Sequence, residues 1–175
     1  MRRIFILTVV LLLSPVISAQ TNPIDEIFEK YSEKEGFTSI YISGKMLGML
    51  GGMEAKSGNT DNLMLRLKSI RILTEDDSLS KTNVNFFTEL SKKLDLSVYE
   101  ELMVIREGQD VTKFLVRQNG DRISELLMIS GGTNGNSLIS IRGDMNLKEI
   151  SQLSKTIGVE QLEQLEGIDK KQPGK

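Results

Sequence analysis

The 175-residue chain contains neither cysteine nor histidine. Without cysteine, no disulfide framework can form, no thiol nucleophile is present, and the lipobox needed for a lipid anchor is missing. Without histidine, the chain lacks the side chain most often used for general acid-base catalysis near neutral pH. Serine-histidine-aspartate and cysteine-histidine mechanisms are therefore excluded, as is a zinc site of the common histidine and cysteine type. We expect no metal and no cofactor.

The chain also lacks a strong excess of charge of either sign. It carries 22 basic against 24 acidic residues, a net charge of −2. Removing residues 1–19, which hold two arginines and no acid, would leave a net charge of −4. Nucleic-acid binding depends largely on clustered positive charge, so we expect no nucleic-acid partner.

Long hydrophobic runs are scarce as well, and the one that exists lies at the start of the chain. Arg2 and Arg3 precede an apolar run over residues 4–13, and small residues around Ala19 follow it. This pattern is typical of a cleavable signal peptide over 1–19, although a buried core helix or an uncleaved anchor would also contain such a run. The run is shorter than the ~20 residues that a membrane-spanning helix needs, so we expect no transmembrane segment. The predicted location is periplasmic or secreted, after cleavage near Ala19.

Hydrophobic periodicity predicts a single α+β domain over 20–168 and a disordered tail over 169–175. We expect an antiparallel-rich sheet with a C-terminal four-stranded meander and helices on one face. The predicted elements are helix 23–34, strand 37–43, a short mobile helix within 45–54, strand 65–73, helix 76–95, strands 102–106, 111–117, 122–129 and 138–142, and helix 147–157.

Two local motifs carry specific predictions. Asn119-Gly120 is a strong hairpin signal and predicts a type I′ turn, in which both central residues have positive φ. Asn146 and Glu149 have the spacing of a capping box, which predicts that the closing helix begins there.

Candidate binding residues lie in one segment that combines large apolar side chains with three glycines. The candidates for partner binding are Met46, Leu47, Met49, Leu50 and Met53. Methionine suits surfaces that adapt to a partner, whereas an apolar stripe at helical spacing also suits a core. Glycine is a poor helix former, so its presence here suggests either close packing against another backbone or mobility.

Three stretches of this sequence resemble a known family: PIDEIFEKYSEKEGFTSIYIS, ISIRGDMNLKEISQLSK and LEQLEGIDKK. They are similar to the exported bacterial family labelled domain of unknown function 4252, typical of Bacteroidetes-type envelopes, over about 23–171. Members of that family carry either a plain or a lipoprotein signal, and this chain, without cysteine, matches only the first kind. The resemblance implies export to the cell envelope and no particular activity.

Three hypotheses for function remain after these exclusions. The leading one is a non-enzymatic envelope protein that binds another envelope protein or a peptide. The second is a glycan-acting enzyme that uses paired carboxylates. The third is a carrier of a small apolar ligand. No catalytic residue is predicted, because the available acids are not distinguished from a solvated surface by their spacing. These acids include Asp76, Asp77, Glu89, Glu100 and Glu101.

Overall fold

The computed structural model describes residues 22–55, 62–76, 84–133 and 135–150. The predicted signal peptide, the predicted tail and most of the predicted closing helix lie outside these residues.

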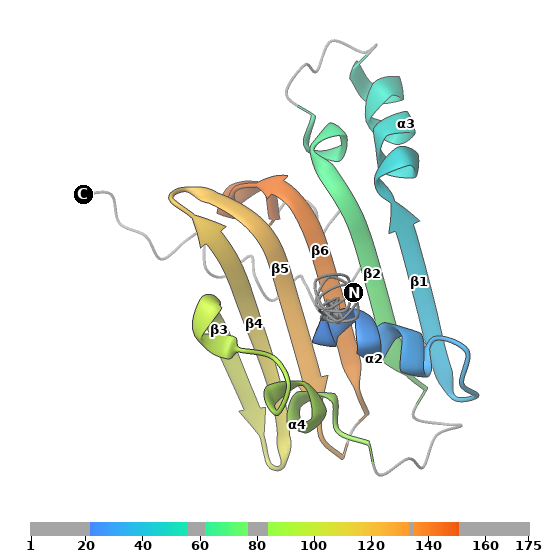
Figure 1. Cartoon of the computed structure of the whole chain (residues 1–175), viewed down its shortest axis with the longest axis vertical. Coiled ribbons are helices and arrows are strands. Elements are labelled where there is room, and N and C mark those ends of the chain that lie inside the picture. The colour runs from blue at the N-terminus through green and yellow to red at the C-terminus, as the bar shows by residue number, and fades with distance from the viewer. Residues whose placement is uncertain (1–21, 56–61, 77–83, 134, 151–175) are drawn as a thin grey trace, which may run out of the picture.

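The described residues form an α+β domain around a six-stranded antiparallel sheet with the order β1-β2-β6-β5-β4-β3 (Figure 1). The last four strands in the chain form a meander, so the predicted fold class is confirmed. The strands are β1 (Phe37–Ser43), β2 (Leu67–Glu75), β3 (Glu100–Glu107), β4 (Asp110–Asn119), β5 (Arg122–Gly131) and β6 (Ser137–Met145). The helices are α2 (Pro23–Tyr31), α3 (Gly44–Ala55) and α4 (Phe86–Ser91), with short 3-10 turns η1 (Leu63–Leu65) and η2 (Leu96–Val98).

The first described helix, α2, begins where its sequence predicts. The side chain of Asn22 accepts a hydrogen bond from the backbone N–H of Ile24, and Pro23 occupies the first turn, where its missing N–H costs nothing. The helix ends at Tyr31, three residues before the predicted end. Gly36, with a φ of 82°, then turns the chain into β1.

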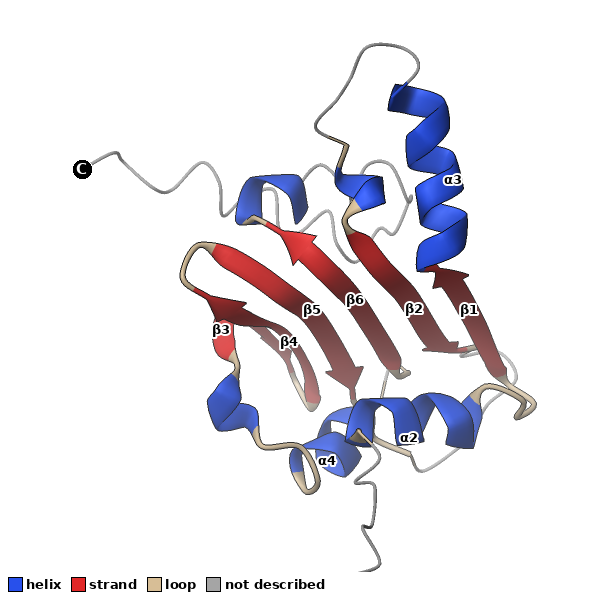
Figure 2. Cartoon of the chain, turned by 45° about the horizontal axis from the view of Figure 1, so that its top comes forward, coloured by secondary structure: helices blue, strands red, loops and turns tan. Residues whose placement is uncertain are grey.

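The sheet has an apolar cluster on each face, because successive residues of a strand point to opposite sides. In β5, Leu126 and Met128 belong to one cluster, whereas Leu127 and Ile129 belong to the other. α2 and α4 pack against the second cluster and lie across that face of the sheet (Figure 2). The first cluster includes Leu47 of α3 and Ile150, which lies in a helical stretch over 147–150, so the described helices do not all pack on one face as predicted.

The predicted capping box at the start of that helical stretch is confirmed. The Asn146 side chain accepts from the Glu149 N–H at 2.9 Å, and the Glu149 carboxylate accepts from the Asn146 N–H at 2.8 Å.

The predicted type I′ turn is wrong. Asn119 pairs with Arg122, so the two central residues of the hairpin are Gly120 and Asp121. Gly120 has a φ of 59°, and none of the described non-glycine residues has a positive φ. Positive φ at the first central position alone is the geometry of a type II′ turn, which needs only one glycine. Asn119 remains in the strand ladder.

The predicted helix over 76–95 is also wrong in extent. Within the described part of that range, α4 covers only Phe86–Ser91. The Asn85 side chain accepts from the Thr88 N–H, and the Asp95 side chain accepts from the Ser97 N–H. Asn85 therefore caps α4 within the predicted range, whereas Asp95, at the predicted end, caps η2, which lies beyond it.

Candidate functional site

The candidate binding segment forms α3, which follows β1 directly and extends past the end of the sheet (Figure 1). Two of its glycines lie at contacts that attach this helix to the rest of the molecule. A Cβ at Gly44 would lie 2.7 Å from the Lys68 carbonyl oxygen, so only glycine lets the helix start this close to β2. Further along, the Asn62 side chain donates to the carbonyl of Gly51 at 3.1 Å. α3 is therefore fixed to β2 and η1 along one side.

Four of the five predicted binding residues lie at the surface of α3. The exposed fractions are 49% for Met46, 62% for Met49, 42% for Leu50 and 70% for Met53. Leu47 is only 2% exposed and belongs to the hydrophobic core, so its prediction as a binding residue is wrong. The reason is helical geometry, since Leu47 lies on the side of α3 that faces the sheet.

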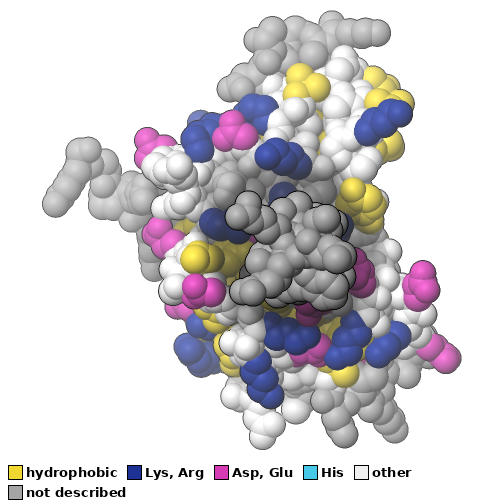
Figure 3. All heavy atoms as spheres, in the orientation of Figure 1, with side chains coloured by type: hydrophobic (Ala, Val, Ile, Leu, Met, Phe, Trp, Pro, Cys, Tyr) yellow, Lys and Arg dark blue, Asp and Glu magenta, His cyan; other side chains and the backbone are white. Residues whose placement is uncertain are grey.

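We call Met46, Met49, Leu50 and Met53, which recur at helical spacing along one side of the helix, the α3 surface. Figure 3 shows hydrophobic side chains gathered over the part of the molecule that carries α3.

The glycines of α3 fall into two groups. A Cβ at Gly51 would lie 3.0 Å from the side chain of Leu65, so this glycine serves packing within the molecule. A Cβ at Gly48 or Gly52 would meet nothing within 4 Å. Packing among the described residues therefore does not explain Gly48 and Gly52, which lie four residues apart on neighbouring turns.

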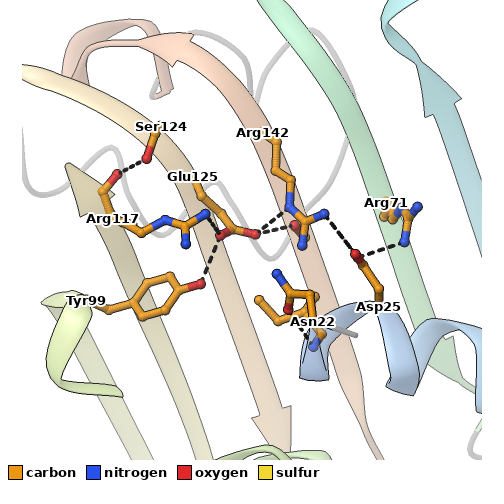
Figure 4. A network of polar contacts seen from close by, with 10 residues as sticks. Asn22, Asp25, Arg71, Tyr99, Arg117, Ser124, Glu125 and Arg142 are labelled. Atoms are coloured by element: carbon orange, nitrogen blue, oxygen red, sulfur yellow. Dashed lines mark hydrogen bonds and ion pairs between the residues drawn. The ribbon is translucent and has the colours of Figure 1, made fainter. Parts of the chain in front are cut away.

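A second group of residues, which the sequence analysis missed, forms a charged network beneath α2 (Figure 4). Its centre is Glu125 of β5, which is fully buried. One carboxylate oxygen accepts hydrogen bonds from Ser140 Oγ at 3.0 Å and Arg142 Nε at 2.8 Å. The other accepts from the Tyr99 hydroxyl at 2.9 Å and pairs with Arg117 Nη2 at 2.9 Å. Both oxygens are thus engaged by donors.

The network continues from Arg142 to the first turn of α2. Asp25 pairs with Arg142 Nη1 at 3.0 Å and with Arg71 Nη1 at 2.9 Å. Burial lowers the pKa of Arg142, but hydrogen bonds to Glu125 and Asp25 outweigh it and raise that pKa above its ordinary value. Burial and the charge of Glu125 raise the pKa of the Tyr99 hydroxyl far above its ordinary value. Arg142 therefore stays charged, Tyr99 stays neutral, and α2 is tied to β2, β5 and β6.

The strand pattern contains a signal that would have identified Glu125. In ISELLMIS, Glu125 alternates with Leu127 and Ile129, and apolar residues also fill the other face, so Glu125 occupies an inward position of a strand that is buried on both sides. A charged residue at such a position needs partners, because an isolated buried charge is very costly.

The acids considered in the sequence analysis do not converge on one site. Glu100 and Glu101 lie exposed on β3, where they contact Gln118 and Lys113. Glu89 lies on α4 and bonds to side chains of α2. Asp77 lies outside the described residues.

Two open depressions lie beside α2 and α4. The larger, about 700 Å³, includes Asn22, Lys93, Tyr99 and Arg117 among its lining residues. The smaller, about 430 Å³, lies beside Tyr31 and Glu89. Both have mixed polar and apolar walls.

Two features are absent from the described residues. No cluster of three or more acidic, histidine or cysteine side chains in that part of the chain could hold a metal ion. No helix within it is long and apolar enough to cross a membrane.

A model of the family described as "Domain of unknown function (DUF4252)" matches residues 31–153. The chain belongs to this family. The match covers more than half of the chain and confirms the resemblance noted in the sequence. The DUF4252 range contains the whole sheet, the α3 surface and Glu125, whereas Asp25 precedes it. No protein with a curated description and no solved structure matches the chain.

Proposed function

We propose that this DUF4252 protein is an exported, non-enzymatic envelope protein that binds a protein or peptide through the α3 surface. The observation that carries the proposal is the exposure of four large apolar side chains on one helix, each at 42% or more. Single exposed apolar residues are ordinary, but a gathered group of them marks an interaction site far more often.

The chemistry of the α3 surface fits a protein partner. Methionine side chains are flexible and polarizable, so they adapt to the shape of an apolar partner. Leu47 anchors the opposite side of α3 in the core, so the surface is presented by a helix that is already positioned.

The enzyme and carrier hypotheses receive no comparable support from the described residues. Asp25 and Glu125 are two acids that the fold brings to a shared partner, since both are joined to Arg142 by ion pairs. A general acid or base must instead exchange a proton with its substrate. A carrier needs a mostly apolar enclosed cavity, whereas the depressions beside α2 and α4 are open and mixed in lining.

The proposal is tested with the variant Met49→Glu, expressed in the native host with an affinity tag at its carboxyl end. Tagged protein is isolated from the envelope fraction, its mass shows whether residues 1–19 have been removed, and the copurifying protein is identified. Binding of the purified pair is then measured by calorimetry. We expect Met49→Glu to weaken binding by at least about tenfold, since hot-spot side chains contribute 2 kcal/mol or more.

The matched control is Val98→Glu, which places the same charge on a side chain of similar exposure, 52%, on η2. It should leave binding unchanged. The free energy of unfolding of both variants should lie within about 1 kcal/mol of the parent, as is usual for surface changes. Equal binding by the parent and Met49→Glu would contradict the proposal, as would a loss of several kcal/mol in the stability of Met49→Glu.

A further inference from the structure

The two edge strands of the sheet differ in how they are protected against pairing with another strand. An edge strand presents unpaired N–H and C=O groups, and proteins protect such edges with charges, prolines or bulges. β3 carries Glu100, Glu101, Arg106 and Glu107, and its register with β4 shifts between Glu101 and Met103. β3 therefore has two of these protections.

β1 has none of them. Its sequence, FTSIYIS, contains no charged residue and no proline. Its register with β2 runs unbroken from Phe37 to Ser43. β1 ends the strand order of the sheet, so none of the described strands pairs with its outer side (Figure 1). Ile40 and Tyr41, which point to opposite faces, are 44% and 62% exposed.

We propose that β1 pairs antiparallel with β1 of a second copy of this chain, about a two-fold axis at Ile40. This register places Ile40 opposite its own counterpart and Thr38 opposite Ile42 on one face, so every pair there is β-branched. On the other face it places Tyr41 opposite Ser39 and Phe37 opposite Ser43. Each aromatic ring thus meets a small side chain in the other copy, without overlap of two large groups.

The lack of charge on β1 also favours a second copy of this chain as its pairing partner. β1 carries no charge, so pairing it with itself brings no like charges together. β3 with β3 would bring glutamates of two copies together, which opposes pairing at the other edge.

β1 is also held in a defined conformation before any pairing. The guanidinium of Arg71 lies 5.2 Å from the ring centre of Tyr41, and Arg71 is itself held by Asp25. Phe37 stacks on Phe86, with ring centres 5.9 Å apart. A strand ordered by β2 and by these contacts loses little further conformational entropy when a second strand is added.

This interface is separate from the α3 surface, and the inference goes beyond the proposed function. Since the paired strands run in opposite directions and α3 follows the end of β1, the two α3 surfaces lie at opposite ends of the paired strands. The dimer would therefore present two binding surfaces, which raises avidity for a partner with two sites.

The test is the mass of the purified protein in solution, measured by sedimentation equilibrium for the parent, Ile40→Lys and Ile40→Glu. We expect the parent to be a dimer. Each variant places two like charges opposite each other at the axis and should weaken the dimer by more than about tenfold. An equimolar mixture of the two variants should regain the dimer, because lysine then faces glutamate.

Val98→Lys, at 52% exposure on η2, is the control and should remain dimeric. A circular dichroism spectrum equal to that of the parent establishes that each variant is folded. A parent that stays monomeric up to about 0.1 mM, where even weak pairs form, would overturn the inference. So would variants that dimerise as well as the parent, or a mixture that stays monomeric. Partner capture by Met49→Glu is measured separately, so failure here leaves the proposed function standing.

Discussion

The region beneath α2 and the region formed by α3 and β1 differ in whether their side chains already have partners within the molecule. Beneath α2, the charged groups of Asp25, Glu125 and Arg142 pair with one another and join the helix to the sheet. Around α3 and β1, by contrast, large apolar side chains such as Met53 and Tyr41 are exposed at 70% and 62%.

This difference shows which side chains can still gain free energy by binding a partner. Groups that are already paired gain little from a new partner and lose much if a contact is broken. Exposed apolar side chains gain from any partner that removes them from water. The charged groups beneath α2 therefore stabilise the fold, whereas the exposed apolar side chains at α3 and β1 are the basis of the two proposed interfaces.

The comparison between the two regions would be contradicted most clearly if Glu125 contributed little to the free energy of unfolding. Glu125→Ala should lower the free energy of unfolding by about 3–5 kcal/mol, because it leaves Arg142 and Tyr99 without their buried acceptor. A urea melt measures the loss. Glu101→Ala removes an exposed partner of Lys113, and its effect should stay within about 1 kcal/mol. Equal losses in the two variants would contradict the structural role of the network.

A second test compares a glycine of α3 that packs against the sheet, Gly44, with one that has open space beside it, Gly48. Gly44→Ala should lower the free energy of unfolding by about 1–3 kcal/mol, because its Cβ would meet a backbone oxygen of Lys68. Gly48→Ala should instead raise it by about 0.5–1 kcal/mol, since alanine is the better helix former and its Cβ meets nothing within 4 Å.

Thermal melts of both glycine variants measure these effects. If a partner approaches the backbone at Gly48, then Gly48→Ala should bind it less tightly although it is more stable. Similar destabilisation by both substitutions would show that the two positions do not differ as described.

The smallest expected effect concerns pH. Burial raises the pKa of the Glu89 carboxyl, but hydrogen bonds from Lys30 Nζ at 2.7 Å and the Tyr31 hydroxyl at 2.8 Å outweigh it, so this pKa lies below its ordinary value of 4.5. A lowered pKa in the folded state means that the contribution is fully present above 4.5 and is lost as pH falls through the folded value.

The parent should therefore lose more stability than Glu89→Gln when pH falls below 4.5. The difference should be under about 1 kcal/mol, because Lys30 is about half exposed and solvent screens the pair. Urea melts at pH 7 and pH 3.5 measure it. An equal or smaller loss in the parent would contradict the lowered pKa.

Local sequence signals predicted several elements closely. Strand 37–43 has the predicted bounds, and the caps at Asn22 and Asn146 form as expected. These features depend on residues close together in the chain, so their causes are visible in sequence. The prediction of a helix over 76–95 was wrong because Asn85 is a starting signal inside an apolar pattern that favoured one continuous helix.

The amino-acid sequence by itself determined the absence of histidine and cysteine chemistry, the α+β class, the C-terminal meander and the DUF4252 resemblance. Composition sets the first of these, hydrophobic period predicts the α+β class and the meander, and the resemblance follows from the residues of three stretches of the sequence. Only the tertiary structure decided that Leu47 is buried beside exposed Met49, that Glu125 joins Arg117 and Arg142, and that β1 lies at an edge. Each depends on which strands become neighbours, and packing between distant segments determines that.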